Sequence, residues 1–100
     1  MIYDSDGNRI LSAEFDLAIG GDQTISLLID CLSGWQLSGE AVADVTVTAR
    51  HGSTGGYTNI ETTPIALDAW DGTQQPFEIR AVRDNTTTGV RNFNLTVARA

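Results

Sequence analysis

The last quarter of the chain, residues 76–99, alternates apolar and polar side chains with the period of a β-strand. The apolar faces of its two arms consist of Phe77, Ile79 and Ala81 in the first arm and Phe93, Leu95 and Val97 in the second. A polar loop that contains Asp84, Asn85 and Gly89 joins the arms, which predicts a β-hairpin. A hairpin with one apolar face needs a second sheet to cover that face, so the rest of the chain is expected to supply it.

Other segments of the chain have the same alternation and are separated by stretches rich in Gly, Ser and Asp. The predicted strands before residue 76 are 10–19, 24–32, 35–37, 41–50, 57–61 and 63–70. In the second of these, Leu28 and Leu32 lie on the face opposite to the main apolar face, which indicates that this strand is covered on both sides or borders a contact. Pro64 indicates that the strand 63–70 begins at a sheet edge, since proline lacks the backbone N–H of a ladder.

These strands and turns predict a β-sandwich of about seven strands, with a β-barrel of similar strand count as the alternative. Helical periodicity longer than one turn is absent from the sequence. One hundred residues are enough for one domain with its own core. We expect residues 1–9 to form an N-terminal arm and turn, and residues 10–100 to form the β-sandwich domain.

The charge balance excludes some classes of partner. The formal net charge is −7, and all six cations are arginine, which argues against nucleic acid as a partner because phosphate binding relies on a cationic surface.

No stretch approaches the roughly 18–20 apolar residues of a membrane helix, so no membrane association is expected. The single cysteine, Cys31, is expected to be a small buried apolar residue. Because the sequence starts with Met1 and has no visible signal peptide, we expect a complete small gene product made in a reducing cytoplasm.

Residues that could carry chemistry are few. His51 is the only histidine and lacks the partner ligands of a zinc site. The run 4–8 matches the first ligand positions of a calcium loop, but Phe15 stands where that loop needs glutamate, so an Asp-Gly turn is the better interpretation. Glu61 and Asp68 are a candidate carboxylate pair, although an acidic surface offers many such pairs. We therefore expect no enzyme activity, no catalytic residue, no metal and no cofactor.

Aromatic residues and the N-terminus are the candidate contacts for a partner. Trp35, Tyr57 and Trp70 are expected to serve as core residues or loop anchors, as anchors of a protein interface, or as a surface on which sugars stack. Ile2 and Tyr3 belong to the N-terminal arm, which either adds a strand to a neighbouring molecule or frays. These five residues are the predicted partner-binding set.

A family resemblance rests on four segments. They are the run 45–50 (Val-Thr-Val-Thr-Ala-Arg), the loop and strand 55–60 (Gly-Gly-Tyr-Thr-Asn-Ile), the run 77–80 (Phe-Glu-Ile-Arg) and the run 92–97 (Asn-Phe-Asn-Leu-Thr-Val). Together they resemble small immunoglobulin-like β-sandwich proteins of tailed bacteriophage virions, including capsid decoration (cement) proteins. The resemblance covers about half of the chain, from Val45 onward, and makes the expected fold class an all-β, immunoglobulin-like antiparallel β-sandwich. The sequence lacks the inter-sheet cysteine pair of antibody domains.

The resemblance implies a non-enzymatic virion structural protein. Such a protein is made in the host cytoplasm, binds the major capsid protein on the outer capsid surface as a homo-oligomer (a trimer or a dimer), and stabilises the head. The alternative function is a carbohydrate-binding or receptor-binding module of a phage tail or an adhesin.

Overall fold

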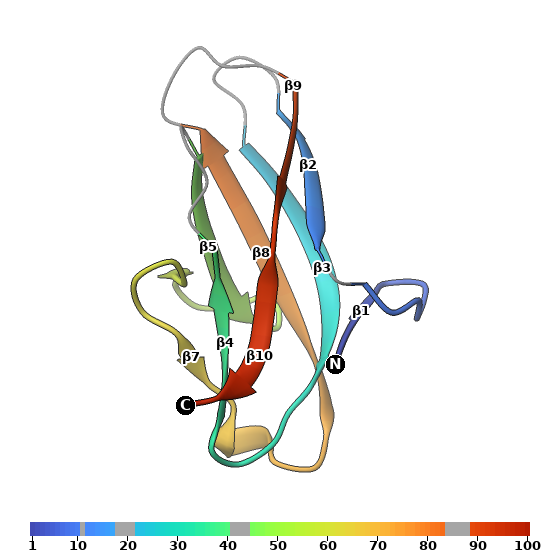
Figure 1. Ribbon diagram of the computed structural model, residues 1–100, viewed down its shortest axis with the longest axis vertical. Coiled ribbons are helices and arrows are strands. Elements are labelled where there is room, and N and C mark those ends of the chain that lie inside the picture. Colours follow the sequence, from blue (N-terminus) through green and yellow to red (C-terminus); the bar gives the residue numbers. More distant parts are fainter. Residues whose placement is uncertain (11, 18–21, 41–44, 84–88) are drawn as a thin grey trace.

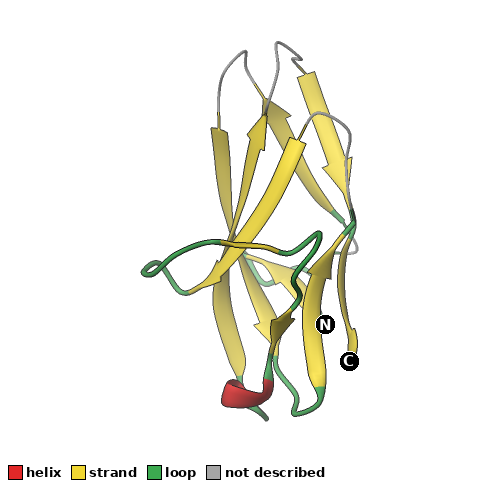
Figure 2. Cartoon of the chain, turned by 90° about the vertical axis from the view of Figure 1, so that its left-hand side faces the viewer, coloured by secondary structure: helices red, strands yellow, loops and turns green. Residues whose placement is uncertain are grey.

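The computed structural model describes residues 1–10, 12–17, 22–40, 45–83 and 89–100, which fold into two packed layers of antiparallel strands (Figure 1; Figure 2). The first layer is a five-stranded sheet in the spatial order β1 (Ile2–Asp4), β3 (Asp22–Asp30), β8 (Gln74–Arg83), β5 (Val45–His51) and β6 (Thr58–Asn59). The second layer pairs β2 (Ala13–Leu17) with β9 (Gly89–Phe93), and below them has the order β10 (Leu95–Arg99), β4 (Trp35–Gly39), β7 (Ile65–Ala66). The predicted all-β antiparallel sandwich is confirmed.

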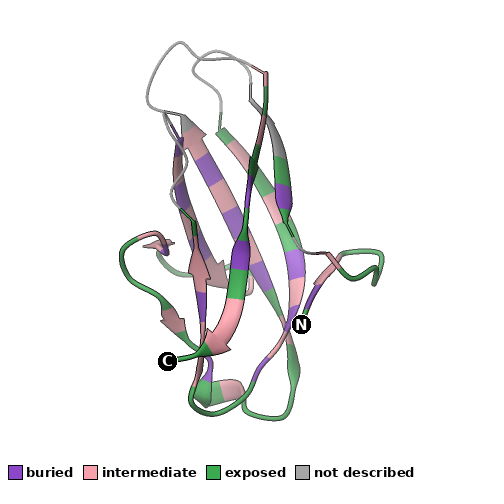
Figure 3. Ribbon diagram, in the orientation of Figure 1, coloured by how far each residue is buried: buried purple, intermediate pink, exposed green. Residues whose placement is uncertain are grey.

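Alternation of side chains along each strand places the core between the layers (Figure 3). On β8 the side chains of Phe77, Ile79 and Ala81 are fully buried, and the residues between them are half-buried on the outer face. The neighbouring strand β5 repeats the pattern, and its register sets Ala49 opposite Ile79. Because the larger residue faces the smaller one, the inner face of the sheet stays even enough to pack against the second layer.

The predicted hairpin of residues 76–99 is wrong, although both of its arms are strands. β8 pairs with β3 on one side and β5 on the other, whereas β9 pairs with β2 and β10 pairs with β4. The two arms therefore lie in opposite layers, and their apolar faces meet across the core. The residues 84–88 of the connecting loop lie outside the described part of the chain. Alternation defines the buried face of a strand and leaves its neighbours open, which is why the pairing was misassigned.

The described part of the chain has ten strands, compared with the seven or so expected. One long strand is divided at Asn94 into β9 and β10, and β1, β6 and β7 have only two or three residues each. The predicted strand 63–70 is shorter than expected: it keeps β7 and then turns into the 3-10 helix η1 (Asp68–Trp70), where Ala69 is exposed. As Pro64 indicated, β7 is the last strand of its sheet.

Residues 2–10 are part of the sandwich. β1 pairs with β3 through Ile2 and Ile29, and Ile2 is buried. The Asp-Gly turn that follows has the expected form, because Asp4 Oδ1 accepts hydrogen bonds from the backbone N–H groups of Asp6 and Asn8. In the described residues, no helix has the length and apolar character needed to cross a membrane.

Candidate functional site

An apolar groove lies between β1 of the first layer and β10 of the second. Both strands are in the lower half of Figure 1. Its volume is about 580 Å³, which is within the usual range for binding sites. The residues that line it are Met1, Ile2, Arg9, Ile10, Asp30, Leu32, Trp35, Leu95 and Val97. The groove therefore brings together Ile2 and Trp35 of the predicted partner-binding set.

The rim of the groove exposes apolar side chains to solvent. Met1 is 54% exposed and Leu32 is 45% exposed. Among the described residues only Val90 is another large apolar side chain of comparable exposure, so two of the three lie at this groove. A group of exposed apolar side chains at a concave surface is typical of an interaction site, whereas single exposed apolar residues scattered over a surface are normal. Leu32 is one of the two residues whose position predicted a strand that is covered on both sides or borders a contact.

Backbone groups form the wall of the groove on the β10 side. Asn94 O accepts from Glu40 N at 3.0 Å, and Ala100 N donates to Gly34 O at 2.9 Å, so the even-numbered residues of this strand are hydrogen-bonded to β4. In an antiparallel ladder the alternate residues point their N–H and C=O groups to the other side. The N–H and C=O groups of Val97 and Arg99 therefore face the groove side, and β10 is the end strand of its described sheet.

The wall on the β1 side is closed by the chain itself. Ile10 N donates to Ile2 O at 2.9 Å, and Asp4 N donates to Asn8 O at 2.8 Å, so residues 8–10 cover the outer edge of β1. Covering an edge in this way removes a template for pairing with another chain. The groove consequently has one covered edge and one open edge.

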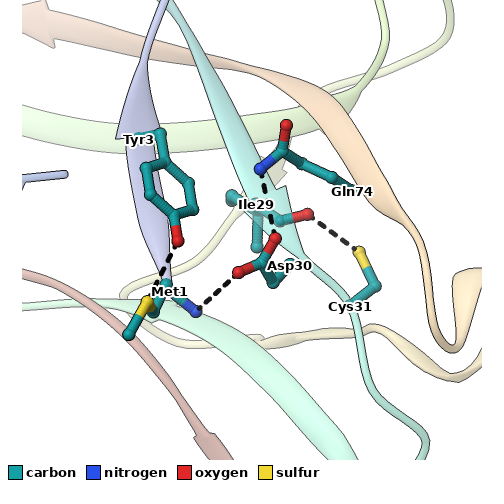
Figure 4. A network of polar contacts seen from close by, with 6 residues as sticks. All are labelled: Met1, Tyr3, Ile29, Asp30, Cys31 and Gln74. Carbon is teal, nitrogen blue, oxygen red and sulfur yellow. Dashed lines mark hydrogen bonds and ion pairs between the residues drawn. The ribbon is translucent and has the colours of Figure 1, made fainter. Parts of the chain in front are cut away.

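Polar contacts hold the lower rim in place (Figure 4). Asp30 Oδ1 accepts from Gln74 Nε2 at 3.2 Å, and Asp30 Oδ2 lies 3.8 Å from the N-terminal amine. The Tyr3 hydroxyl donates to Met1 Sδ at 3.0 Å, and Tyr3 itself lies on the face of β1 opposite to Ile2.

Cys31 is buried, as expected, and its thiol donates to Ile29 O at 3.4 Å. Burial, and to a lesser degree the Asp30 carboxylate, raises the pKa of the Cys31 thiol, so it is a poor nucleophile.

Tyr57 belongs to a separate polar cluster on the outer face of the five-stranded sheet. Its hydroxyl donates to Glu78 Oε1 at 3.2 Å, and the guanidinium of Arg50 lies 4.5 Å from the ring centroid. Arg50 also forms an ion pair with Glu78 at 2.5 Å. These contacts tie the loop before β6 to β5 and β8, so the ring of Tyr57 acts as a loop anchor.

Trp70 is also an anchor. Its ring stacks on His51 with centroids 4.2 Å apart and an interplanar angle of 18°, and it meets Phe77 edge-on at 5.5 Å. The His51 ring is further held by Gln75, whose Oε1 lies 2.9 Å from Nε2. The three predicted aromatic residues thus have different neighbours, and they do not form the row of rings on which a sugar chain would stack.

The two candidate catalytic carboxylates serve the backbone. Glu61 Oε1 accepts from Val47 N at 3.3 Å, whereas Asp68 Oδ1 accepts from Gly34 N in the loop before β4. In the part of the chain that the structure describes, no group of three or more His, Cys, Asp and Glu side chains is arranged to hold a metal ion.

The comparisons with known proteins give no match: no family model fits the sequence, and no curated protein and no solved structure matches the chain. The fold defines the class of the protein as an all-β antiparallel sandwich, and an apolar groove lies between its layers.

Proposed function

We propose that this protein is a non-enzymatic structural protein that docks onto a larger assembly. The assembly is the phage capsid that the sequence resemblance implies, where the protein would act as a decoration protein on the outer surface. The observation that carries the docking role is the apolar groove with an open strand edge on an otherwise acidic protein. Glu61 and Asp68, the carboxylates considered for catalysis, each accept a hydrogen bond from the backbone of a neighbouring segment and so hold the fold together.

The partner in this proposal is the major capsid protein, and the docked form is a homo-oligomer, a trimer or a dimer. Many copies on one shell make a weak individual contact sufficient, since multivalent attachment raises the effective affinity. The resemblance and the groove support this function over a carbohydrate-binding or receptor-binding module, since the three aromatic residues are dispersed. Glycan binding that disappears in Trp35→Ala would favour that alternative instead.

The test is binding of the purified protein to expanded heads of the phage that encodes it. We expect attachment at a fixed copy number, measured by electron microscopy of the decorated heads, and a higher temperature of DNA release. Failure to bind those heads would refute the capsid role.

A matched pair of variants tests the groove itself. Leu32→Glu adds a charge at the groove rim, and Val90→Glu adds the same charge on β9 at a residue of similar exposure, 48% against 45%. Both side chains are exposed enough for the fold to tolerate the change. We expect Leu32→Glu to lose head binding and Val90→Glu to keep it; equal loss in both would place the contact elsewhere.

A further inference from the structure

Among the described residues, no strand of the second layer pairs with the outer edge of β10. In the upper half, β9 has β2 at its side over its whole length, from Gly89 paired with Leu17 to Phe93 paired with Ala13. After Asn94 the same strand continues as β10, and in the described chain this lower half is bordered by the groove instead.

The backbone of β10 is set to receive a strand there. Val97 and Arg99 direct their N–H and C=O groups to the groove side, as derived from the register with β4. The opposite edge of β4 follows the same rule, since Trp35 O accepts from Leu67 N at 2.9 Å and Gly39 N donates to Ile60 O at 3.1 Å. The ladder has no shift in register between Leu95 and Arg99, so β10 offers a regular edge.

The floor of the groove suits the side chains of one extended segment. Ile2, Ile10 and Trp35 line the groove beside β10, and alternate residues of a guest strand would point toward this apolar lining. The first layer extends beyond β10, because β1 and the turn after it lie past its outer edge in Figure 1. If a second copy of the sandwich paired edge to edge with β10, its own β1 and turn would collide with those of the first copy. A single extended segment has no such projecting part and can lie over β1.

Charge favours an acidic guest. Arg9 lines the groove and Arg99 lies on β10, while Leu95 to Arg99 include no acidic residue, in a chain whose net charge is −7. The acidic residue of the groove, Asp30, already accepts a hydrogen bond from Gln74 and faces the N-terminal amine.

We propose that the groove takes one extended peptide segment of a partner protein, which adds a strand to β10 by backbone hydrogen bonds. Its alternate residues are apolar and face Ile2, Ile10 and Trp35, and its ends carry Asp or Glu near Arg9 and Arg99. The proposal deepens the docking role proposed above and rests on it for the identity of the partner; the binding mode itself is tested without a capsid.

The probes are synthetic peptides of about seven residues, long enough to cover β10. The panel is built on Asp-Ile-Thr-Val-Thr-Ile-Asp, with Val, Leu or Phe varied at the apolar positions. Controls are a scrambled order of the same residues, Lys in place of both Asp residues, and a version N-methylated on the groups that would donate to β10. Amide hydrogen exchange by NMR reads the site: Val97 and Arg99 gain protection on binding, while Thr96 and Ala98 are protected with or without peptide.

Two variants separate the backbone contact from the side chain. Val97→Ala keeps the N–H, and Val97→Pro removes it at an edge position where proline costs no bond to β4. We expect Val97→Pro to bind the peptide about tenfold more weakly than Val97→Ala. If Val97→Pro fails to fold, the N-methylated peptide makes the same test on the unchanged protein.

The proposal is overturned if no peptide of the panel protects Val97 and Arg99 at about 1 mM, or if the scrambled and N-methylated peptides bind as well as the parent. If the unchanged protein binds the peptide but does not bind the phage heads, the capsid role is refuted and strand addition stands. Head binding that survives in Val97→Pro would refute strand addition and leave the capsid role standing.

Discussion

Gly39 is the position at which adding a single methyl group tests the packing of the core. Its φ lies outside the left-handed region, so alanine is allowed by the backbone. A Cβ at this position would lie 3.1 Å from both Cδ1 and Cγ1 of Ile60, and Ile60 is only 1% exposed. Carbon atoms in contact normally lie about 3.5–4.0 Å apart, so Ile60 would have to move by about half an ångström in a close-packed interior.

The expected cost follows from this overlap. Over-packing of a core destabilises a protein by about 1–3 kcal/mol, so we expect Gly39→Ala to lower the free energy of unfolding by about 2 kcal/mol. Ile60→Val alone should cost about 1 kcal/mol because it removes one methyl group. In the double variant the alanine methyl occupies the space that Cδ1 leaves, while the clash with Cγ1 persists. The two changes should therefore cost about 1 kcal/mol less together than their sum.

Urea unfolding monitored by the fluorescence of Trp35 and Trp70 measures all four proteins of this cycle. Gly56→Ala is the control, since Gly56 is exposed and a Cβ there meets no atom within 4 Å. We expect this control to be neutral or slightly stabilising, because alanine reduces the freedom of the unfolded chain. A neutral Gly39→Ala, or strictly additive effects in the double variant, would refute the account of Gly39 as a contact point for Ile60.

Two further predictions concern the outer cluster and the buried thiol. Glu78→Gln should lower the free energy of unfolding by about 1–2 kcal/mol because it breaks a half-buried ion pair with Arg50. Tyr57→Phe should lower it by about 0.5–1.5 kcal/mol because it removes one hydrogen bond. A larger loss in Tyr57→Phe than in Glu78→Gln, measured by urea unfolding, would contradict this. Since the pKa of the Cys31 thiol is raised in the folded chain, the unfolded chain loses that proton first as pH rises. Stability should therefore fall with pH above about 8.5, the ordinary thiol value, and Cys31→Ala should show a shallower fall in parallel melts, while equal slopes would count against the shift.

The strands were accessible from the sequence because a period of two is a local property. Val45 and Val47 of β5, and Phe77 and Ile79 of β8, are buried as their alternation predicted. Pairing is different in kind, because it depends on which faces fit after the chain has crossed between layers. A polar loop after Arg83 is compatible with a hairpin and with a crossover, and only the tertiary packing selects the crossover.

The candidate site was only partly accessible for the same reason. Ile2 and Trp35 were predicted as contact residues, and they do line the groove, while the sequence analysis did not select Arg9, Ile10 or Val97. No motif links the five groove residues, since they come from three separate parts of the chain: residues 2–10, residue 35 and residue 97. Leu32 was a further signal, because it is an apolar residue on the outer face of the strand predicted for residues 24–32.

The edges of the two layers explain why the groove is the place to expect a partner. An open edge of a sheet invites pairing with other chains, and proteins usually shorten or cover it. In the described chain, β6 and β7 are edges of two residues each, and the edge of β1 is covered by residues 8–10. β2 is also a five-residue edge strand, but its sequence contains Glu14 and Asp16. β10 keeps a five-residue edge beside exposed apolar side chains and carries a single charge, on Arg99. An edge that invites aggregation to this degree is best accounted for if a partner strand covers it in the assembled state, which is the outcome that the protection of Val97 and Arg99 would reveal.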